Sequence, residues 1–208
     1  MSYRQLQEAI VAGKLEIAVV TVNQAIAEGA NPKSLIDDYM VKGMEEIGAR
    51  FEEGKAFVPN LLMSARAMKG ALEIVKPLLK SESATSIGKI VIGTVKGDLH
   101  DIGKNLVASM LEGCGFEVVN LGVDISAEKF IEAARNESAD IICLSALLTT
   151  TMTYMKEIIE AVRQSGLDVK IMVGGAPVNE AFANSIGADG YSSNANAAVT
   201  LSKSLMSA

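Results

Sequence analysis

KIVIGTVKGDLHDIG, residues 89–103, is the stretch that best predicts the fold of this chain. Its first seven residues form an almost continuous apolar run, which is typical of a strand buried on both faces of a parallel sheet. Runs of the same kind cover residues 116–121, 140–148, 169–173 and, last, about 190–191. Segments with helical spacing lie near 103–113, 126–137, 152–165 and 178–186 and from about 195. The pattern predicts a Rossmann-like, flavodoxin-like domain with a five-stranded parallel sheet.

The chain before this stretch has a different period. Apolar residues such as Leu6 and Ile10 recur three or four positions apart, which is the spacing of amphipathic helices. The expected helices cover about 3–12, 14–28, 32–52 and 57–80. Because their connections are short, they predict an antiparallel four-helix bundle.

A small polar segment, SESATSIG at residues 81–88, separates the two patterns. It has no periodicity that would let it pack as an element, so we expect a linker. The chain is therefore expected to have a helical domain over residues 1–84 and an α/β domain over residues 85–208.

Composition excludes several classes of protein. The net charge of -6 argues against nucleic acid as a partner, since binding to a phosphate backbone requires a basic face. The spacing of Cys114 and Cys143 supports neither a disulfide framework nor a zinc site, and we expect both to be reduced core residues. The N-terminus lacks a signal-peptide core, and no apolar run approaches the roughly 20 residues that span a bilayer. We therefore expect a cytoplasmic protein without a membrane partner.

Unusual residues follow three of the predicted strands. In an open parallel sheet, ligands bind beyond the carboxyl ends of the strands. His100, the single histidine of the chain, stands there between Asp98 and Asp101. A carboxylate bonded to one ring nitrogen sets the tautomer and makes the other nitrogen a better metal ligand. Taken alone, this loop fits a surface histidine in a solvated turn equally well.

The other two loops carry hydroxyl groups and glycines. Ser145 and Thr149 flank Leu147 after the third strand, and hydroxyl groups at a strand end more often cap a helix or bind backbone than contact a cofactor. Gly174 and Gly175 after the fourth strand form an ordinary tight turn, or else they let a large flat ligand approach the main chain. Either function is compatible with each segment on its own.

Together, the three motifs carry a resemblance. Asp98-x-His100-x-x-Gly103, then Ser145-x-Leu147, then Gly174-Gly175 resemble, in this order, the cobalamin-binding signature of the corrinoid proteins of methyltransferase systems and of cobalamin-dependent methionine synthase. The helical half, from Glu45 to Lys69, is similar to the bundle that caps methylcobalamin in those proteins. The resemblance covers essentially the whole chain.

The resemblance implies that cobalamin binds base-off, with His100 as the lower ligand of cobalt and Asp98 holding the imidazole. The implied cofactor-binding residues are Gly97, Asp98, Leu99, His100, Asp101, Ile102, Gly103, Ser145, Leu147, Thr149, Gly174, Gly175, Asn194 and Ala195. Phe57, Val58 and Leu61 match the region that covers the upper face of cobalt, although they fit ordinary bundle core equally well. Thr151 stands where methionine synthase has the serine of a His-Asp-Ser proton relay, and its reach to Asp98 is open.

The activity implied is that of a methyl carrier, in which cobalt alternates between Co(I) and methyl-Co(III). Such a carrier is a component of a methyltransferase system rather than a stand-alone enzyme. Its partners are a substrate-specific methyltransferase, a second methyltransferase that serves an acceptor such as tetrahydrofolate or coenzyme M, and a reductive activase. The sequence leaves the methyl donor open among methylamines, methanol, glycine betaine and aryl methyl ethers.

Three other interpretations remain. The cobalamin-binding subunit of an adenosylcobalamin mutase shares the α/β motifs but lacks a helical cap. A cobalamin-dependent sensor would need a DNA-binding module, and the chain has no basic recognition helix. A cofactor-free, flavodoxin-like receiver domain leaves the Ser-x-Leu and Gly-Gly motifs unexplained.

Overall fold

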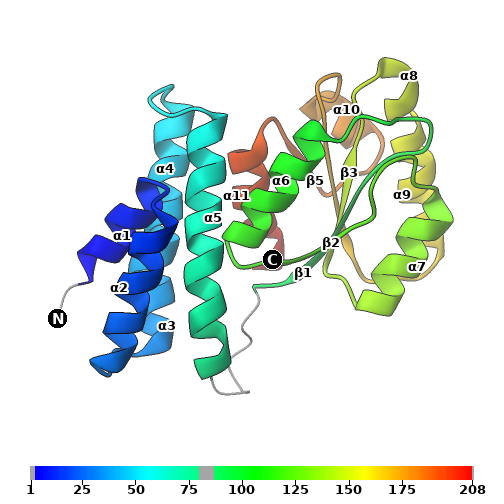
Figure 1. Cartoon of the computed structure of the whole chain (residues 1–208). Coiled ribbons are helices and arrows are strands. Elements are labelled where there is room, and N and C mark those ends of the chain that lie inside the picture. The colour runs from blue at the N-terminus through cyan, green and yellow to red at the C-terminus, as the bar shows by residue number, and fades with distance from the viewer. Residues whose placement is uncertain (1–2, 80–86, 208) are drawn as a thin grey trace. The chain divides into compact units, whose positions relative to one another are not determined.

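A computed structural model describes residues 3–79 and 87–207, which divide into a helical unit and an α/β unit (Figure 1). The predicted boundary between residues 84 and 85, and most of the predicted linker over 81–88, lie outside the described residues. Each unit is built from the helices or strands that the spacing of its apolar residues predicts. The predicted order, a helical part followed by a five-stranded parallel α/β part, is therefore confirmed.

The helical unit contains the four predicted helices. Its elements are α1 (Arg4–Val11), α2 (Leu15–Ala27), α3 (Pro32–Leu35), the π-helical turn η1 (Ile36–Met40), α4 (Val41–Glu52), α5 (Val58–Val75) and the 3-10 turn η2 (Lys76–Leu78). The third predicted helix starts where Asn31 Oδ1 accepts from the amides of Lys33 and Ser34, as an N-cap does. It continues through a wider turn, in which the Val41 amide donates to Ile36 O, so it is one helix with a π-bulge.

The core of the helical unit consists of the apolar residues that repeat at helical spacing. Leu6 and Ile10 of α1 and Leu61 and Met68 of α5 are fully buried. Removing each such side chain from water stabilises the fold by about 1.5–3 kcal/mol. The amphipathic pattern therefore determines which face of each helix turns inward.

The α/β unit has a single parallel sheet in the order β2-β1-β3-β4-β5. Its strands are β1 (Lys89–Thr94), β2 (Glu117–Asn120), β3 (Ile141–Ser145), β4 (Lys170–Gly174) and β5 (Gly190–Ser192). The helices are α6 (Ile102–Gly113), α7 (Ala127–Glu137), α8 (Thr149–Met152), α9 (Tyr154–Gln164), α10 (Glu180–Ser185) and α11 (Ala195–Met206). This is the strand order of flavodoxin-like sheets, the fold that the sequence predicted, and the order reverses between β1 and β3, where ligands bind in such sheets.

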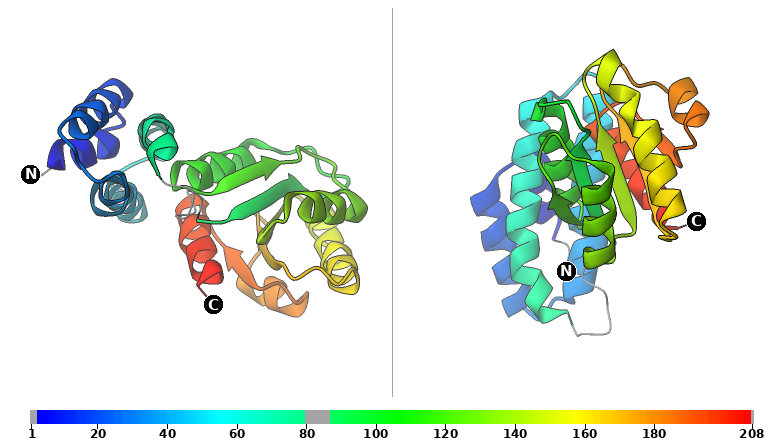
Figure 2. Two further views of the ribbon diagram at one scale, coloured as in Figure 1. Left: turned by 90° about the horizontal axis from the view of Figure 1, so that it is seen from below. Right: turned by 90° about the vertical axis from the view of Figure 1, so that its right-hand side faces the viewer.

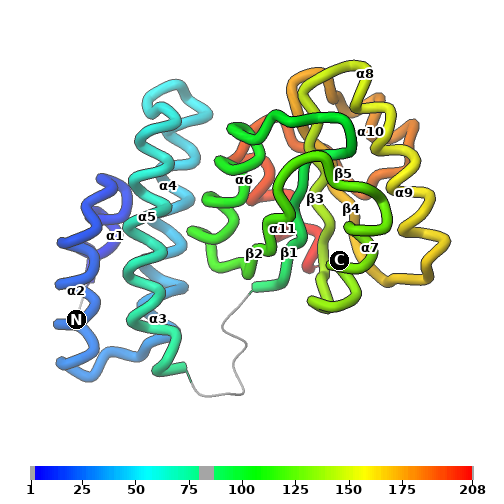
Figure 3. Tube along the Cα trace, turned by 45° about the vertical axis from the view of Figure 1, so that its right-hand side comes forward, coloured from blue at the N-terminus to red at the C-terminus, as the bar shows by residue number. Residues whose placement is uncertain are grey.

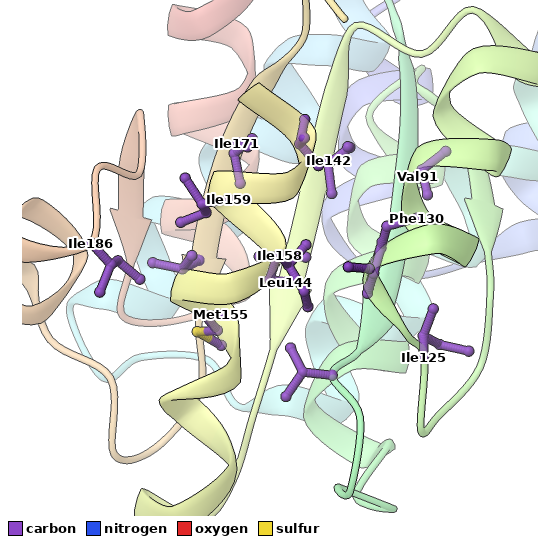
Figure 4. Close-up of a cluster of buried hydrophobic side chains, with 14 of the residues drawn as sticks. Val91, Ile125, Phe130, Ile142, Leu144, Met155, Ile158, Ile159, Ile171 and Ile186 are labelled. Atoms are coloured by element: carbon purple, nitrogen blue, oxygen red, sulfur yellow. The ribbon is translucent and has the colours of Figure 1, made fainter. Parts of the chain in front are cut away.

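Helices cover both faces of this sheet (Figure 2). On the face of α7 and α9, Phe130 packs among Val91, Ile142 and Leu144 in one apolar cluster (Figure 4). On the other face, α11 lies against the sheet, as the hydrogen bond from the Ser202 hydroxyl to Met172 Sδ of β4 at 3.3 Å shows. Burial on both faces explains why the strands are continuous apolar runs.

Two predicted boundaries are wrong at the carboxyl edge of the sheet. The strand predicted over 140–148 ends at Ser145, because the chain then turns and the amides of Leu147 and Leu148 point at the Asp98 carboxylate. The helix predicted over 152–165 is α9, which begins at Tyr154, and the short helix α8 before it was not predicted. Within residues 3–79 and 87–207, no helix is both long and apolar enough to cross a membrane.

Gly175→Ala is expected to destabilise the α/β unit strongly. Gly175 has φ +130°, and a Cβ atom there would overlap the carbonyl oxygen of Ala146. Because backbone strain and a clash with main chain act together, we expect the free energy of unfolding to fall by about 2–4 kcal/mol. Urea denaturation followed by circular dichroism measures this loss.

Gly166→Ala is the matched control for this substitution. Gly166 has φ +71°, yet nothing lies within 4 Å of the added Cβ atom. It should therefore lose only about 1 kcal/mol from backbone strain. Equal losses in the two variants would contradict the proposed clash with Ala146.

Candidate functional site

Asp98 and His100 lie on the loop between β1 and α6, at the carboxyl edge of the sheet (Figure 3). The buried hydroxyl of Thr94, the last residue of β1, donates to His100 O at 2.9 Å. The Asp98 amide donates to Val95 O at 3.1 Å. These bonds fold the loop back onto the end of its strand, while half of the His100 side chain stays exposed (50%).

The Asp98 carboxylate is fully buried and accepts hydrogen bonds from two loops. Its Oδ1 atom lies 2.7 Å from His100 Nδ1 and accepts from the His100 amide at 3.1 Å. Its Oδ2 atom accepts from the Leu147 amide at 2.8 Å and from the Thr151 hydroxyl at 2.6 Å. Burial alone raises the pKa of Asp98, but these hydrogen bonds outweigh it and hold that pKa well below its usual value. Asp98 is therefore ionised at neutral pH and joins the loops after β1 and β3.

Thr151 completes a chain of hydrogen bonds with Asp98 and His100. Its hydroxyl reaches Asp98 Oδ2, and its methyl group approaches the position of a Cβ atom on Gly97 to 3.7 Å. The question that the sequence left open, whether a threonine at this position reaches Asp98, is answered by this geometry. The connected groups are the imidazole, the carboxylate and the hydroxyl, in that order.

The surroundings of His100 fit a metal ion carried by a flat organic ligand. Because Nδ1 faces Asp98, Nε2 is the ring nitrogen left to bind a metal. Large apolar side chains near the loop are exposed, namely Leu99 (72%), Ile102 (87%), Leu147 (42%) and Leu148 (42%). Apolar surface gathered around a half-exposed histidine is typical of a ligand-binding surface. A corrinoid, which brings its own cobalt and can accept a nitrogen ligand from a protein, fits this donor set.

A row of small residues crosses four strands next to this loop. Thr94 pairs in register with Ser145, Ser145 with Gly174, and Gly174 with Ser192. Residues paired in this way point to the same face of a sheet. The carboxyl end of one face therefore lacks large side chains, and it carries hydroxyl groups instead.

The predicted cofactor-binding residues all lie at the carboxyl edge of the sheet. The loop after β1 contains Gly97, Asp98, Leu99, His100 and Asp101, and α6 begins with Ile102 and Gly103. The end of β3 and the chain after it contain Ser145, Leu147 and Thr149, and the end of β4 and the next position are Gly174 and Gly175. The start of α11 is formed by Asn194 and Ala195. The Asp98 carboxylate joins two of these residues, His100 and Leu147, and it also binds the predicted relay residue Thr151. Asn194 has a structural role as well, because its Oδ1 atom caps α11 by accepting from the Ala197 amide at 2.8 Å.

The three residues predicted to cover cobalt lie in the helical unit and differ in exposure. Phe57 and Val58 at the start of α5 are exposed, whereas Leu61 is fully buried. Leu61 is thus a core residue, and Phe57 and Val58 present apolar surface. A role in covering the cofactor stays a prediction for all three.

Sequence reasoning missed several polar residues near the loop of His100. Asp124 has φ +56° and Oδ1 within 2.7 Å of the Gly97 amide. Lys104 is buried, and burial lowers its pKa although the nearby Asp101 opposes the shift. Its ammonium group donates to Asn120 Oδ1 at 2.6 Å. These residues belong to no motif that we recognised. The signal that could have indicated them is their place, since they are polar residues close to the ends of predicted strands.

Comparison with known proteins finds relatives along the whole chain. Residues 88–200 and residues 3–76 each match a family model described as a B12 binding domain. Dimethylamine corrinoid protein 1 of Methanosarcina acetivorans is 42% identical over 206 residues, which are 98% of this chain and 96% of that protein. Both halves are therefore similar to proteins that bind B12.

Two solved structures resemble the chain over nearly all of its length. A cobalamin-binding protein from Desulfitobacterium hafniense has a TM-score of 0.84 and 31% identity, and the match covers 99% of this chain and 98% of that one. A chain of the methanol:cobalamin methyltransferase complex from Methanosarcina barkeri has a TM-score of 0.84 and 32% identity, with 99% of this chain and 79% of that one covered. The fold and the order of the two parts are thus shared with cobalamin proteins.

Thr151→Val should raise the pKa of Asp98 toward its usual value, because valine keeps the shape of threonine but has no hydroxyl donor. A depressed pKa of Asp98 stabilises the folded protein above the unfolded-state pKa of about 3.9, and this contribution is lost as the pH falls through the folded-state pKa. We expect the variant to lose about 1.5–3 kcal/mol of unfolding free energy near neutral pH, with a smaller loss below about pH 4. Urea unfolding at several pH values measures this difference.

Thr151→Ser keeps the hydroxyl and serves as the control. It should retain most of the stability of the wild type at every pH. If Thr151→Val lost the same free energy in acid as at neutral pH, Thr151 would stabilise the fold without acting on Asp98.

Proposed function

Because this chain belongs to the family of B12-binding corrinoid proteins, we propose that it carries a methyl group between two methyltransferases on its corrinoid cofactor. Family membership follows from the two matching B12 binding domains and from 42% identity across 98% of the chain. The observation that carries the proposal is the hydrogen-bonded pair of His100 and Asp98 at the carboxyl edge of the sheet.

When bound, the cofactor of this family would supply cobalt as the atom that carries the methyl group between the two partners. We assign His100 Nε2 as the lower ligand of cobalt, replacing the base of the cofactor itself. This base-off arrangement requires space for the tail of the cofactor. The row of small residues formed by Thr94, Ser145, Gly174 and Ser192 supports that placement, because it keeps one end of a sheet face free of bulk.

The residues of the chain hold and orient this ligand. Asp98 accepts the hydrogen of His100 Nδ1, which makes the neutral Nε2 atom a stronger donor to a metal. The apolar side chains of Leu99 and Ile102 exclude water from the lower side of the site. The hydroxyl of Thr151 extends the hydrogen bonds beyond Asp98, so a proton can move along them when the imidazole is not bound to metal.

The helical unit has a covering role in this proposal. Phe57 and Val58 would cover the upper side of cobalt, and their exposure is consistent with such a contact. A covering side chain excludes water from the reactive centre. It must also move aside when a partner enzyme approaches.

Methylamines are the class of methyl donor that we propose, with dimethylamine first. The support is the 42% identity to a dimethylamine corrinoid protein over 98% of this chain, whereas a trimethylamine corrinoid protein is 42% identical over 88% of it and the chain of the methanol:cobalamin methyltransferase complex is 32% identical. That complex also supports a methyltransferase as a docking partner. The second methyltransferase, its acceptor such as tetrahydrofolate or coenzyme M, and a reductive activase belong to the same proposal.

Ligation by His100 can be tested by electron paramagnetic resonance of the protein loaded with cob(II)alamin. Since His100 is the single histidine, labelling all histidine with ¹⁵N labels one imidazole. We expect the nitrogen splitting of the cobalt signal to change from three lines to two on labelling and to disappear in His100→Ala. A three-line pattern that persists after labelling would show that the base of the cofactor is the ligand, and base-off binding would be ruled out.

The methyl donor can be tested with purified partner enzymes. The reduced, cobalamin-loaded protein is mixed with a dimethylamine-specific or a methanol-specific methyltransferase and the matching donor, and methylation is followed by absorption. We expect at least about a tenfold faster reaction with the dimethylamine system, since each 1.4 kcal/mol of better docking is a factor of ten. Equal or faster methylation from methanol would refute the assignment, and activity only with the adenosyl form of the cofactor would indicate a mutase subunit.

A further inference from the structure

Asp124 has an unusual backbone conformation close to the loop of His100. It lies between β2 and α7 with φ +56°, in the left-handed region that residues with a Cβ atom rarely adopt. Such a conformation persists only where the surrounding structure holds it in place, and it is concentrated at functional sites. Ser138 is the other described residue besides glycine with a positive φ, and it caps the end of α7.

The strained residue binds the first part of the His100 loop. Asp124 Oδ1 accepts from the Gly97 amide at 2.7 Å, and the Asp124 amide donates to Asp98 O at 3.1 Å. Gly97 has φ +81° and no side chain, so its backbone would be free to turn without these bonds. Asp124 therefore fixes the conformation of the two residues that precede Leu99 and His100.

A second set of bonds holds the other end of the same loop. Asn105 Nδ2 donates to Asp101 Oδ2 at 2.9 Å, and Asn105 Oδ1 accepts from Asn120 Nδ2 at 3.0 Å. The buried Lys104 ammonium group donates to both amide oxygens, at 2.6 Å each. Asp101 follows His100 directly and is the last residue before α6, so this network holds the C-terminal end of the loop.

Each set of bonds includes one residue of the short segment Asn120–Asp124, which is itself fixed to β1. The Leu121 amide donates to Ile92 O at 2.8 Å, and the Thr94 amide donates to Gly122 O at 3.0 Å. The segment cannot shift without breaking these strand-like bonds. It is a rigid support that bonds the His100 loop directly before the histidine, at Gly97 and Asp98, and reaches Asp101 after the histidine only through Asn105.

We infer that Asn120–Asp124 clamps the loop of His100, at its start directly through Asp124 and at its end through Asn105, and that Asp124 and Asn120 are positioning residues for the cobalt ligand. The inference rests on the proposed function, in which His100 binds cobalt. Among residues 3–79 and 87–207, Asp98 is the partner that bonds the half-exposed imidazole, so the position of the imidazole depends on how firmly the main chain at residues 97–101 is fixed. A fixed loop favours the bound state of the ligand because less freedom is lost on binding.

Three substitutions of Asp124 separate the side-chain bond from the backbone strain. Asp124→Asn keeps an acceptor and tolerates positive φ, so it should keep the wild-type spectrum. Asp124→Gly removes the acceptor and the strain, and Asp124→Ala removes the acceptor and retains the strain. In protein loaded with cob(II)alamin, both should lower the ratio of histidine-bound to histidine-free cobalt by about tenfold, as expected for the loss of one hydrogen bond to a charged group.

Asn120→Ala tests the other end of the clamp, and a similar decrease is expected. Ser138→Ala is the matched control, because it places alanine at nearly the same positive φ away from the site. It should lower stability and leave the cobalt spectrum unchanged. Wild-type ratios in Asp124→Ala, Asp124→Gly and Asn120→Ala would overturn the inference.

A second measurement does not depend on the cofactor. Hydrogen exchange of the Gly97 amide in the cofactor-free protein, followed by nuclear magnetic resonance, should be slow in the wild type and in Asp124→Asn and at least about tenfold faster in Asp124→Gly. Equal exchange rates would refute the clamp. If wild-type cobalt shows no histidine nitrogen while exchange behaves as expected, the proposed function fails and the clamp stands.

Discussion

The hydrogen bonds to the buried Asp98 carboxylate are the interaction on which the rest of the site depends. A charge without water around it is costly, and this cost is offset only when donors replace the lost hydration. The donors come from the loop after β1 and from the loop after β3, which are about fifty residues apart in sequence. Satisfying one carboxylate therefore brings two loops together at the point where strand order reverses.

This arrangement leaves His100 with one ring nitrogen engaged and one available. The imidazole is oriented by Asp98, the loop beneath it is held by Asp124, and the exposed apolar side chains beside it provide the surface on which a corrinoid would lie. The protein contributes orientation, hydrogen bonding and exclusion of water, whereas the bond-making chemistry belongs to the cofactor. A small carrier with these parts needs a partner enzyme to select the methyl donor.

Small residues at the strand ends serve the same site in two ways. Gly175 is required by the close approach of Ala146 O, so its role is to let two loops meet. Gly174 belongs to the row with Thr94, Ser145 and Ser192, which lacks large side chains, and a Cβ atom on it would lie 3.2 Å from Ser192 O. Close approach of main chain therefore favours glycine at both positions, and Gly174 also helps to keep large side chains away from this end of the sheet face.

The sequence by itself determined the helices and the five buried strands. A helix that buries one side has apolar residues three or four positions apart, and a strand buried on both faces is a continuous apolar run, so both patterns are visible along the chain. The sequence also placed the loop of His100 at the carboxyl edge of the sheet, since parallel strands share that edge. Only the tertiary structure decided that β3 ends at Ser145, that Thr151 reaches Asp98, that Asp124 bonds the loop of His100 and that Asn120 reaches this loop through Asn105. Those contacts join residues that are distant in sequence. Their formation depends on strand register and backbone angles, which hydrophobic periodicity does not report.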